Sequence, residues 1–226
     1  MDSGAAAVRH QAEDFEGIED EMMTVDEIGN DGGRAGHVSV RRADPDEYEA
    51  VGELTVAAYR ADGLLRGADG SADHYAPVLR DTATRDAQAE VWVAVDDHDA
   101  LLGTVTWCPP GSPYREIAHS PDEAEFRMLA VPPVLRRRGA ARALVLACIN
   151  RARAEGMRAV LLSSLPQMTA AHGLYRDLGF LRAPDLDHHP IPLVDLWAFQ
   201  LSLTSPAPIE SRSVQSRHSP GLESHP

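Results

Sequence analysis

The 226-residue sequence contains no lysine, and all 21 of its basic residues are arginine, a usage that a GC-rich coding bias explains. Cysteine is also scarce. Cys108 and Cys148 are the only two, which excludes a disulfide framework and is typical of a reducing cytoplasm. Long apolar runs are missing as well, since no segment approaches the roughly 20 residues that cross a bilayer. We therefore expect a cytoplasmic protein without a membrane partner.

Positive charge is in the minority, because the formal net charge is −14 at pH 7. Binding to a phosphate backbone requires basic patches, so this balance argues against nucleic acid as a partner. The acidic segment from Met1 to Met23 lacks the apolar core of a secretory signal. The composition therefore favours an enzyme or a small-molecule binding module over a nucleic-acid-binding protein.

Composition divides the chain into three parts. Residues 1–36 are rich in glycine, alanine and acids without sustained periodicity, and residues 204–226 are rich in serine and proline. Both compositions are typical of disordered tails. Between them, residues 37–203 are long enough to form one well-filled domain.

Apolar periodicity predicts the elements of this domain. Strands are predicted at 38–41, 90–95, 101–108, 125–131, 159–163 and 193–203, and helices at 45–60, 74–84, 139–155 and 169–178. A polar turn joins strands 90–95 and 101–108, which indicates an antiparallel hairpin. The later alternation of strands and helices predicts an α/β (α+β) domain with a mixed sheet and flanking helices.

The most informative junction links the strand EFRMLAV to a helix that begins at Gly139. Pro132-Pro133 stops the strand, and the loop adds the guanidinium groups of Arg136, Arg137 and Arg138. A helix start exposes backbone N–H groups without partners and carries partial positive charge, so it complements a phosphate. Glycine at the junction allows close approach to the backbone.

A basic loop before a helix is most often only a solvated connection. Here the order Arg-x-x-Gly-x-Ala, from Arg136 to Ala141, directly after a strand, favours phosphate binding. The competing phosphate motifs G-x-x-x-x-G-K-[ST] and G-x-G-x-x-G do not occur in the sequence.

The segment EFRMLAVPPVLRRRGAARAL resembles the acyl-CoA signature of the GNAT superfamily of N-acetyltransferases, whose pyrophosphate loop reads [Q/R]-x-x-G-x-[G/A]. Residues Ala171 to Phe180 are similar to the family helix A-x-x-L-Y-x-x-L-G-F, and the resemblance spans about Val38 to Leu203. It implies the GNAT acyl-CoA N-acyltransferase fold. That fold is a mixed, mostly antiparallel sheet, splayed between two central parallel strands that hold acetyl-CoA.

The resemblance also implies a set of residues that bind the cofactor, and it implies no metal. Backbone groups at a bulge would meet the pantetheine arm, because regular strand pairing would consume them; these belong to Met128, Leu129, Ala130 and Val131. Backbone N–H groups would hold the pyrophosphate, with a side-chain contact from Arg142; they belong to Arg136, Arg137, Arg138, Gly139, Ala140 and Ala141.

Two residues are candidates for catalysis. Tyr175 matches the family tyrosine that protonates the departing thiolate, although a helical tyrosine is more often a core residue. Glu125 stands where many relatives carry a glutamate that takes the proton of the amine, and Glu123 is a neighbour able to substitute. Met168 replaces an asparagine common in the family, and His172 is either a second acid/base or a packed side chain.

The segment with His188 and His189 could suggest a metal site, but clustered ligands without a wider framework usually mark a solvated loop. In relatives this loop borders the acceptor pocket, which favours substrate contact.

The leading hypothesis is acetyl transfer from acetyl-CoA to a primary amine of a small molecule or peptide. A homodimer is one candidate for the assembly, and the sequence does not fix the oligomeric state. The acidic composition favours a cationic acceptor. The alternatives are a non-catalytic acyl-CoA-binding sensor and a nucleotide- or phosphate-dependent enzyme on another α/β fold.

Overall fold

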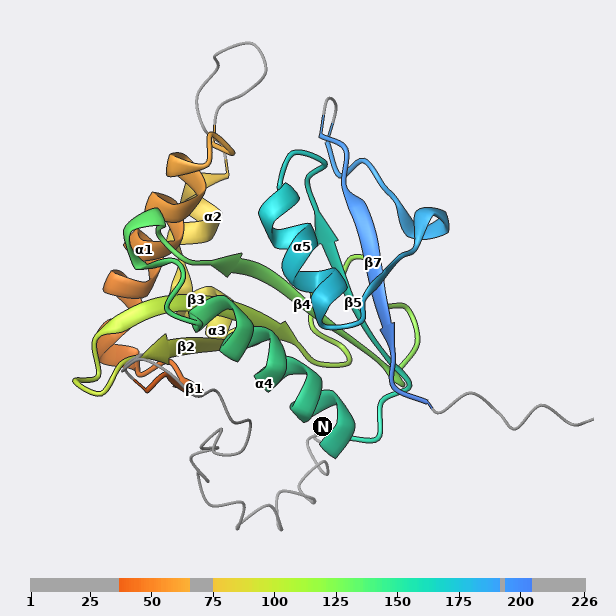
Figure 1. The fold of residues 1–226 in the computed structure, drawn as a ribbon, viewed down its shortest axis with the longest axis horizontal. Coiled ribbons are helices and arrows are strands. Elements are labelled where there is room, and N and C mark those ends of the chain that lie inside the picture. The colour runs from red at the N-terminus through yellow and green to blue at the C-terminus, as the bar shows by residue number, and fades with distance from the viewer. Residues whose placement is uncertain (1–36, 66–74, 192–193, 205–226) are drawn as a thin grey trace, which may run out of the picture.

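The computed structural model describes residues 37–65, 75–191 and 194–204. Within them one sheet has the strand order β1-β2-β3-β4-β5-β7-β6 (Figure 1). Its strands are β1 (Ser39–Arg42), β2 (Glu90–Val95), β3 (Leu101–Cys108), β4 (Glu123–Ala130), β5 (Ala159–Ser164), β6 (Leu181–Arg182) and β7 (Trp197–Ser202). Neighbouring strands are antiparallel except β4 and β5, which run parallel at the centre.

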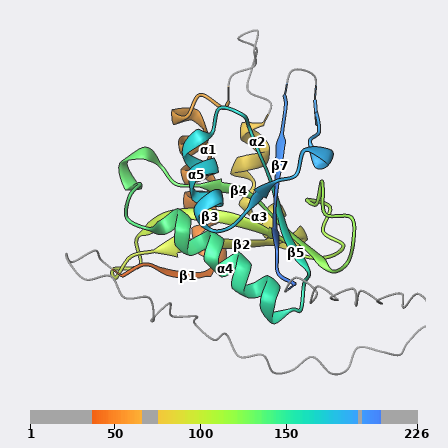
Figure 2. The same cartoon turned by 45° about the vertical axis from the view of Figure 1, so that its right-hand side comes forward.

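Helices cover both faces of this sheet. They are α1 (Tyr48–Ala61), α2 (Ala76–Arg80), α3 (Thr82–Gln88), α4 (Ala140–Ala154) and α5 (Thr169–Asp177), with short 3-10 turns η1 (Pro45–Glu47), η2 (Pro133–Leu135) and η3 (Pro184–Leu186). Figures 1 and 2 show α4 running across one face, where it contacts strands β1 to β5. Helices α1 and α3 pack on the opposite face.

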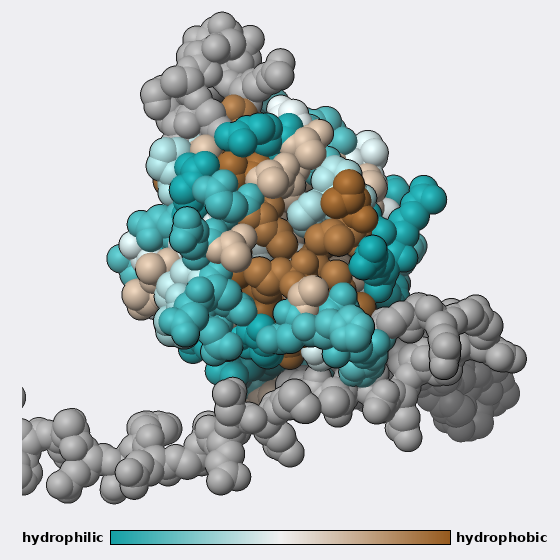
Figure 3. All heavy atoms as spheres, turned by 90° about the vertical axis from the view of Figure 1, so that its left-hand side faces the viewer, coloured by the Kyte–Doolittle hydropathy of each residue, from teal (hydrophilic) through white to brown (hydrophobic). Residues whose placement is uncertain are grey.

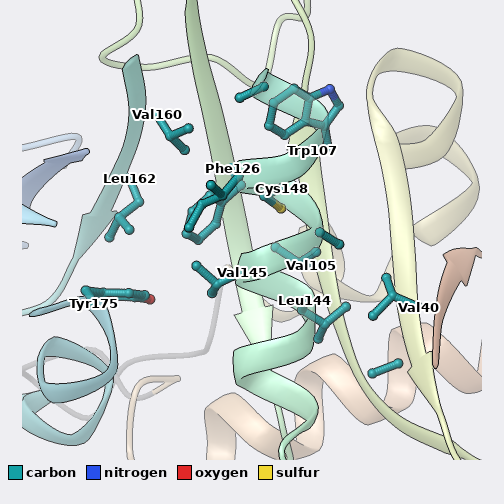
Figure 4. Close-up of a cluster of buried hydrophobic side chains, with 14 of the residues drawn as sticks. Val40, Val105, Trp107, Phe126, Leu144, Val145, Cys148, Val160, Leu162 and Tyr175 are labelled. Atoms are coloured by element: carbon teal, nitrogen blue, oxygen red, sulfur yellow. The ribbon is translucent and has the colours of Figure 1, made fainter. Parts of the chain in front are cut away.

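Alternation along the strands separates the two faces, because successive side chains of a strand point to opposite sides. On β2, Val91, Val93 and Val95 pack with Val51 of α1, whereas Ala94 packs with the α4 side chains. Figure 4 shows the main core on the α4 side, which joins α4 to α5 through residues such as Phe126 and Tyr175. The same alternation on β4 decides which side chains can reach the site.

The two central strands separate soon after they meet. Parallel pairing covers only Glu123–Glu125 against Ala159–Leu161. Beyond these residues β4 pairs only with β3, and β5 only with β7. A bulge accompanies the separation, since Thr104 and Thr106 of β3 face Ala130 and Arg127, and the intervening Met128 has φ 54°. The β4–β5 splay is therefore built into the sheet.

The predicted fold class is confirmed, and most elements lie within a few residues of their predicted bounds. The predicted helix 74–84 is instead two short helices, because Asp81 interrupts it and its carboxylate accepts the Thr84 N–H to cap α3. The last strand begins at Trp197 rather than residue 193, and the two-residue β6 was not predicted.

The predicted tails fall almost wholly on residues 1–36 and 205–226, which lie outside the described residues, so the domain bounds stay predictions. Among the described residues, no helix is long and apolar enough to cross a membrane.

The packing of α1 on α2 depends on a glycine. A Cβ added to Gly52 would lie 2.3 Å from the backbone oxygen of Arg80. We expect Gly52→Ala to lower the free energy of unfolding by about 1–3 kcal/mol, since backbone cannot move aside as a side chain can. Gly173→Ala is the control, because its Cβ would meet nothing within 4 Å. It should stabilise α5 by about 0.5–1 kcal/mol. Urea unfolding gives the free energy of unfolding of both variants. Equal changes in the two would contradict the prediction.

Candidate active site

The β4–β5 splay leaves backbone groups available to a ligand. Past Glu125, the edge of β4 that faces β5 has no strand partner in the described residues. Backbone N–H and C=O groups inside a protein need hydrogen-bond partners, so such an edge suits an extended polar ligand. The predicted segment from Met128 to Val131 lies along this edge or directly after it, and its bulge is at Met128.

The loop that follows β4 ends in an anion-binding geometry. Arg137 and Gly139 adopt left-handed backbone conformations, with φ 64° and 92°. The first bond of α4 runs from the Ala143 N–H to the Gly139 carbonyl, so the N–H groups of residues 140–142 have no partner within the helix. No side chain caps this start. Left-handed residues in such a loop turn successive N–H groups toward one point, which forms a concave anion site.

The arginines of this loop divide into two kinds. The Arg136 side chain donates to the Val131 carbonyl at 2.9 Å and to Asp62 Oδ2 at 2.6 Å, so it ties the loop to the end of α1. Arg137, Arg138 and Arg142 are exposed. Within the described part of the chain, no carboxylate pairs with these three. Their charges remain available to an anion beside the start of α4.

The surface on the α1 side has an apolar centre. Figure 3 shows hydrophobic residues gathered in the middle of this face, with hydrophilic residues around them. An apolar floor with a polar rim is typical of small-molecule sites.

Tyr175 projects from α5 into the aromatic core. Its ring lies 6.3 Å from that of Phe126, 6.0 Å from Phe180 and 5.7 Å from Phe199, and the residue is 3% exposed. Its hydroxyl points toward Val145 of α4 (Figure 4) and makes no hydrogen bond to the described residues. Burial raises the pKa of the Tyr175 phenol above its ordinary value, so the group stays protonated at neutral pH.

Glu125 lies in an environment that suits a loop anchor. The residue is fully buried, and its carboxylate accepts backbone N–H groups from Glu116, Ile117 and Ala118 at 2.9–3.2 Å. Burial raises the pKa of this carboxyl, although the three donors act in the opposite direction. All of these contacts tie Glu125 to the β3–β4 loop, so in this geometry its carboxylate serves as a loop anchor.

Glu123 is occupied in a similar way. Its carboxylate accepts the backbone N–H groups of His119 and Ser120 and pairs with Arg158. The two glutamates expected beside the acceptor therefore hold the β3–β4 loop in place.

Sequence reasoning missed a group of side chains on the face of β4 opposite Tyr175. We name it the tyrosine–arginine cluster: Tyr59 of α1, Tyr75 before α2, Tyr114 of the β3–β4 loop, Arg85 of α3 and Arg127 of β4. Tyr59 and Tyr75 stand 6.3 Å apart between ring centroids, and Arg127 Nη1 donates to the Tyr114 carbonyl at 3.1 Å. Burial raises the pKa of Tyr59, with smaller contributions from Tyr75 and Tyr175. The cluster packs on the α1 side of the sheet, whereas Tyr175 packs in the core on the α4 side.

One carboxylate borders this cluster. Glu116 pairs with Arg127 at 2.7 Å and with His188 Nε2 at 3.2 Å, and its side chain is 26% exposed. His188 lies in the loop that was expected to border the acceptor, whereas His189 pairs with the exposed Asp195. No group of three or more His, Cys, Asp and Glu side chains that could hold a metal occurs among the residues described.

The remaining candidate, His172, is packed. Its Nε2 lies 3.1 Å from Ser164 Oγ, and its ring is close to those of Trp197 and Phe199. Burial lowers the pKa of this histidine. Met168 receives a weak contact from the Ser164 hydroxyl to its sulfur at 3.6 Å.

Comparison with known families agrees with this geometry. A model of the acetyltransferase (GNAT) family matches residues 49–180, which is more than half of the chain. The chain belongs to the GNAT family of acetyltransferases. This GNAT enzyme transfers an acetyl group from acetyl-CoA to an acceptor, so the assignment to a nucleotide-dependent enzyme on another fold is excluded. The family assignment likewise favours an enzyme over a passive sensor.

Solved structures share the fold. An acetyltransferase of the GNAT family from Staphylococcus aureus has a TM-score of 0.56 at 13% identity, over 74% of this chain and 99% of that one. YncA of Salmonella typhimurium, a candidate acetyltransferase with its cofactor acetyl-CoA, has a TM-score of 0.53 at 19% identity, over 77% and 99%. The ribosomal-protein-alanine N-acetyltransferase of Brucella melitensis has a TM-score of 0.52 at 18% identity, over 73% and 99%. No curated protein matches the sequence significantly.

The environment of Glu125 predicts a stability effect. We expect Glu125→Gln to lower the free energy of unfolding by about 1–3 kcal/mol, because the amide would place N–H groups against backbone donors. Glu155→Gln is the control, since it removes only a surface ion pair with Arg151. That variant should stay within about 0.5 kcal/mol of wild type. Chemical denaturation measures the stability of both variants. A Glu125→Gln variant as stable as wild type would rule out Glu125 as the anchor of the β3–β4 loop.

Proposed function

We propose that this enzyme acetylates a primary amine of a small molecule by direct attack of the amine on the thioester of acetyl-CoA. The observation that supports it is the β4–β5 splay, with Tyr175 on one face of β4 and the tyrosine–arginine cluster on the other. The cofactor approaches along the splay from the start of α4, and the acceptor approaches from the cluster. The reacting carbon then lies between them.

In this proposal the residues from Arg136 to Arg142 hold the pyrophosphate. The free N–H groups at the start of α4 supply directional donors, and the unpaired guanidinium groups of Arg137, Arg138 and Arg142 neutralise the charge. Arg136 keeps the loop in place through Asp62. The backbone from Met128 to Val131 aligns the pantetheine arm.

The reaction forms a bond between the amine nitrogen and the acetyl carbon and releases CoA as a thiol. The nitrogen lone pair attacks the thioester carbon, a tetrahedral intermediate forms, and the C–S bond breaks. The departing thiolate takes the proton of the Tyr175 phenol, which burial keeps neutral. Glu116 takes one proton from the ammonium before the attack, and the second proton leaves the nitrogen as the intermediate collapses and returns to the Tyr175 phenolate through solvent. The products are an N-acetyl amide, free CoA and one proton, which Glu116 releases to solvent.

Glu116 is the proton acceptor in this scheme, in place of Glu125. It is the carboxylate that contacts the cluster, and part of its side chain is exposed. Glu125 contributes indirectly, because its three backbone contacts fix the loop that carries Glu116.

The proposed acid and the proposed pyrophosphate loop predict different kinetic effects when each is changed. Tyr175→Phe should lower kcat by roughly 10²–10⁴-fold and leave acetyl-CoA binding unchanged, since only the acid is lost. Gly139→Val should raise KM for acetyl-CoA, because φ 92° is strained for any side chain at the pyrophosphate loop. Initial rates and calorimetry with acetyl-CoA separate the two. A Tyr175→Phe variant with wild-type kcat would contradict the acid role.

The role of Glu116 predicts a pH dependence. Glu116→Gln should lower kcat/KM by about 10²-fold or more near neutral pH. The deficit should shrink as the pH rises toward the pKa of the free amine, about 10 for an alkyl ammonium, because the acceptor then deprotonates without help. Rate profiles from pH 6.5 to 9.5 test this, with Asp177→Asn on the exposed end of α5 as the control. A deficit that stays constant with pH would exclude Glu116 as the base.

A further inference from the structure

Arg85 carries a charge that forms no salt bridge in the described residues, and the carboxylate that acts on it is that of Asp81, which caps α3 and does not contact the guanidinium. Its side chain is fully buried. Nη1 donates to Thr106 Oγ1 at 3.0 Å and lies 3.8 Å from Met128 Sδ, Nη2 donates to Thr82 Oγ1 at 3.1 Å, and Nε has no partner. All of these contacts are to neutral atoms.

Such an arrangement is costly. Removing an ion from water costs several kcal/mol unless an opposite charge compensates for it, and arginine does not escape by losing its proton. Other buried charges nearby are compensated: Asp86 pairs with Arg42, and Glu125 accepts three N–H groups. Arg85 differs from both, because it has hydroxyl groups and a sulfur but no anion.

A second guanidinium lies on the same side of the sheet. Thr106, which accepts the Arg85 bond, is the register partner of Arg127 on β4, so both side chains project to one face. The Arg127 side chain is 17% exposed. Its Nη1 donates to the Tyr114 carbonyl, and its Nη2 pairs with the Glu116 carboxylate. An arginine has five N–H donors, so Arg127 retains capacity for an incoming acceptor. Within the described residues, Arg85 and Arg127 together contact one carboxylate, that of Glu116.

We propose that the tyrosine–arginine cluster binds a carboxylate of the acceptor, so that the substrates are amines that also carry a carboxylate, as amino acids do. The inference rests on the proposed function, because it specifies the acceptor of that same site. Arg127 makes the direct contact, since a guanidinium matches a carboxylate in a planar, bidentate pair. Arg85 of α3 adds a second positive charge, because no carboxylate in the described residues forms a salt bridge with it.

The position of the cluster supports this class of substrate. Arg127 directly precedes Met128, where the bulge opens the splay. A carboxylate held at Arg127 would leave the amine of a small molecule beside the thioester path. The phenol groups of Tyr59 and Tyr114 belong to the same cluster, and a phenol O–H is a suitable donor to an anion. The local charge therefore reverses the cationic acceptor that overall composition favoured.

The test uses the full-length enzyme and a set of matched acceptors: an amino acid, the same amino acid as its carboxamide, and the amine that lacks the carboxyl group. Release of CoA from acetyl-CoA is followed with a thiol reagent. We expect kcat/KM for the amino acid to exceed that for the carboxamide by roughly 10–100-fold, the effect of one charge-assisted contact. Arg127→Met should abolish this preference by raising KM for the amino acid, whereas its effect through Glu116, which pairs with Arg127, should be the same for all three acceptors and so cancel in their ratio.

Two further variants make the result specific. Arg85→Met should also reduce the preference for the amino acid, and it keeps the experiment informative if Arg127→Met disturbs the strand. Arg158→Met, an exposed arginine that pairs with Asp122 and Glu123, should leave the preference unchanged. Equal or better use of the carboxamide and the plain amine overturns the carboxylate site while leaving amine acetylation intact. Acetyl-CoA binding without acetylation of any acceptor overturns the proposed function as well.

Discussion

The parallel pairing of β4 with β5 lasts for three residues, and the rest of the site depends on where it stops. A fully paired centre would bury every backbone group of both strands in the sheet. Because parallel pairing ends at Glu125 and Leu161 and a bulge follows at Met128, the backbone groups at the carboxyl ends of the two strands are not paired with each other. The loop after β4 leads to the start of α4, so the segment that we propose to hold the pyrophosphate directly follows this interruption.

Strand β4 also separates the two reacting partners. Side chains alternate along it, so Phe126 packs against Tyr175 on one face while Glu125 and Arg127 project to the other. The acid that we propose and the acceptor residues that we propose thus approach the splay from opposite sides. Glu125 is drawn under the β3–β4 loop, where three N–H groups compensate for its burial.

Charge behaves differently at the scale of the chain and at the scale of the site. The chain has a net charge of −14, yet Arg85 is buried without a carboxylate partner and Arg127 shares only Glu116. Electrostatic interactions are strongest where water is excluded, so a few buried groups outweigh many solvated acids. The cationic acceptor expected from composition and the carboxylate-bearing acceptor that we propose differ because the first averages over solvated surface, whereas the second rests on the buried groups of the site.

The sequence by itself determined the family and the segment that we propose to bind the cofactor. The strand, the Arg-x-x-Gly-x-Ala loop and the start of α4 are contiguous, so residue order alone fixes their geometry, and the positive φ of Gly139 and the bulge at Met128 agree with it. Only the tertiary structure brings together the residues that we propose for the acceptor. Tyr59, Tyr75, Arg85, Tyr114 and Arg127 come from five separate segments that meet through packing on one face of the sheet. Glu125 shows the same limit, because its position in the strand was readable, but the loop that covers it was not.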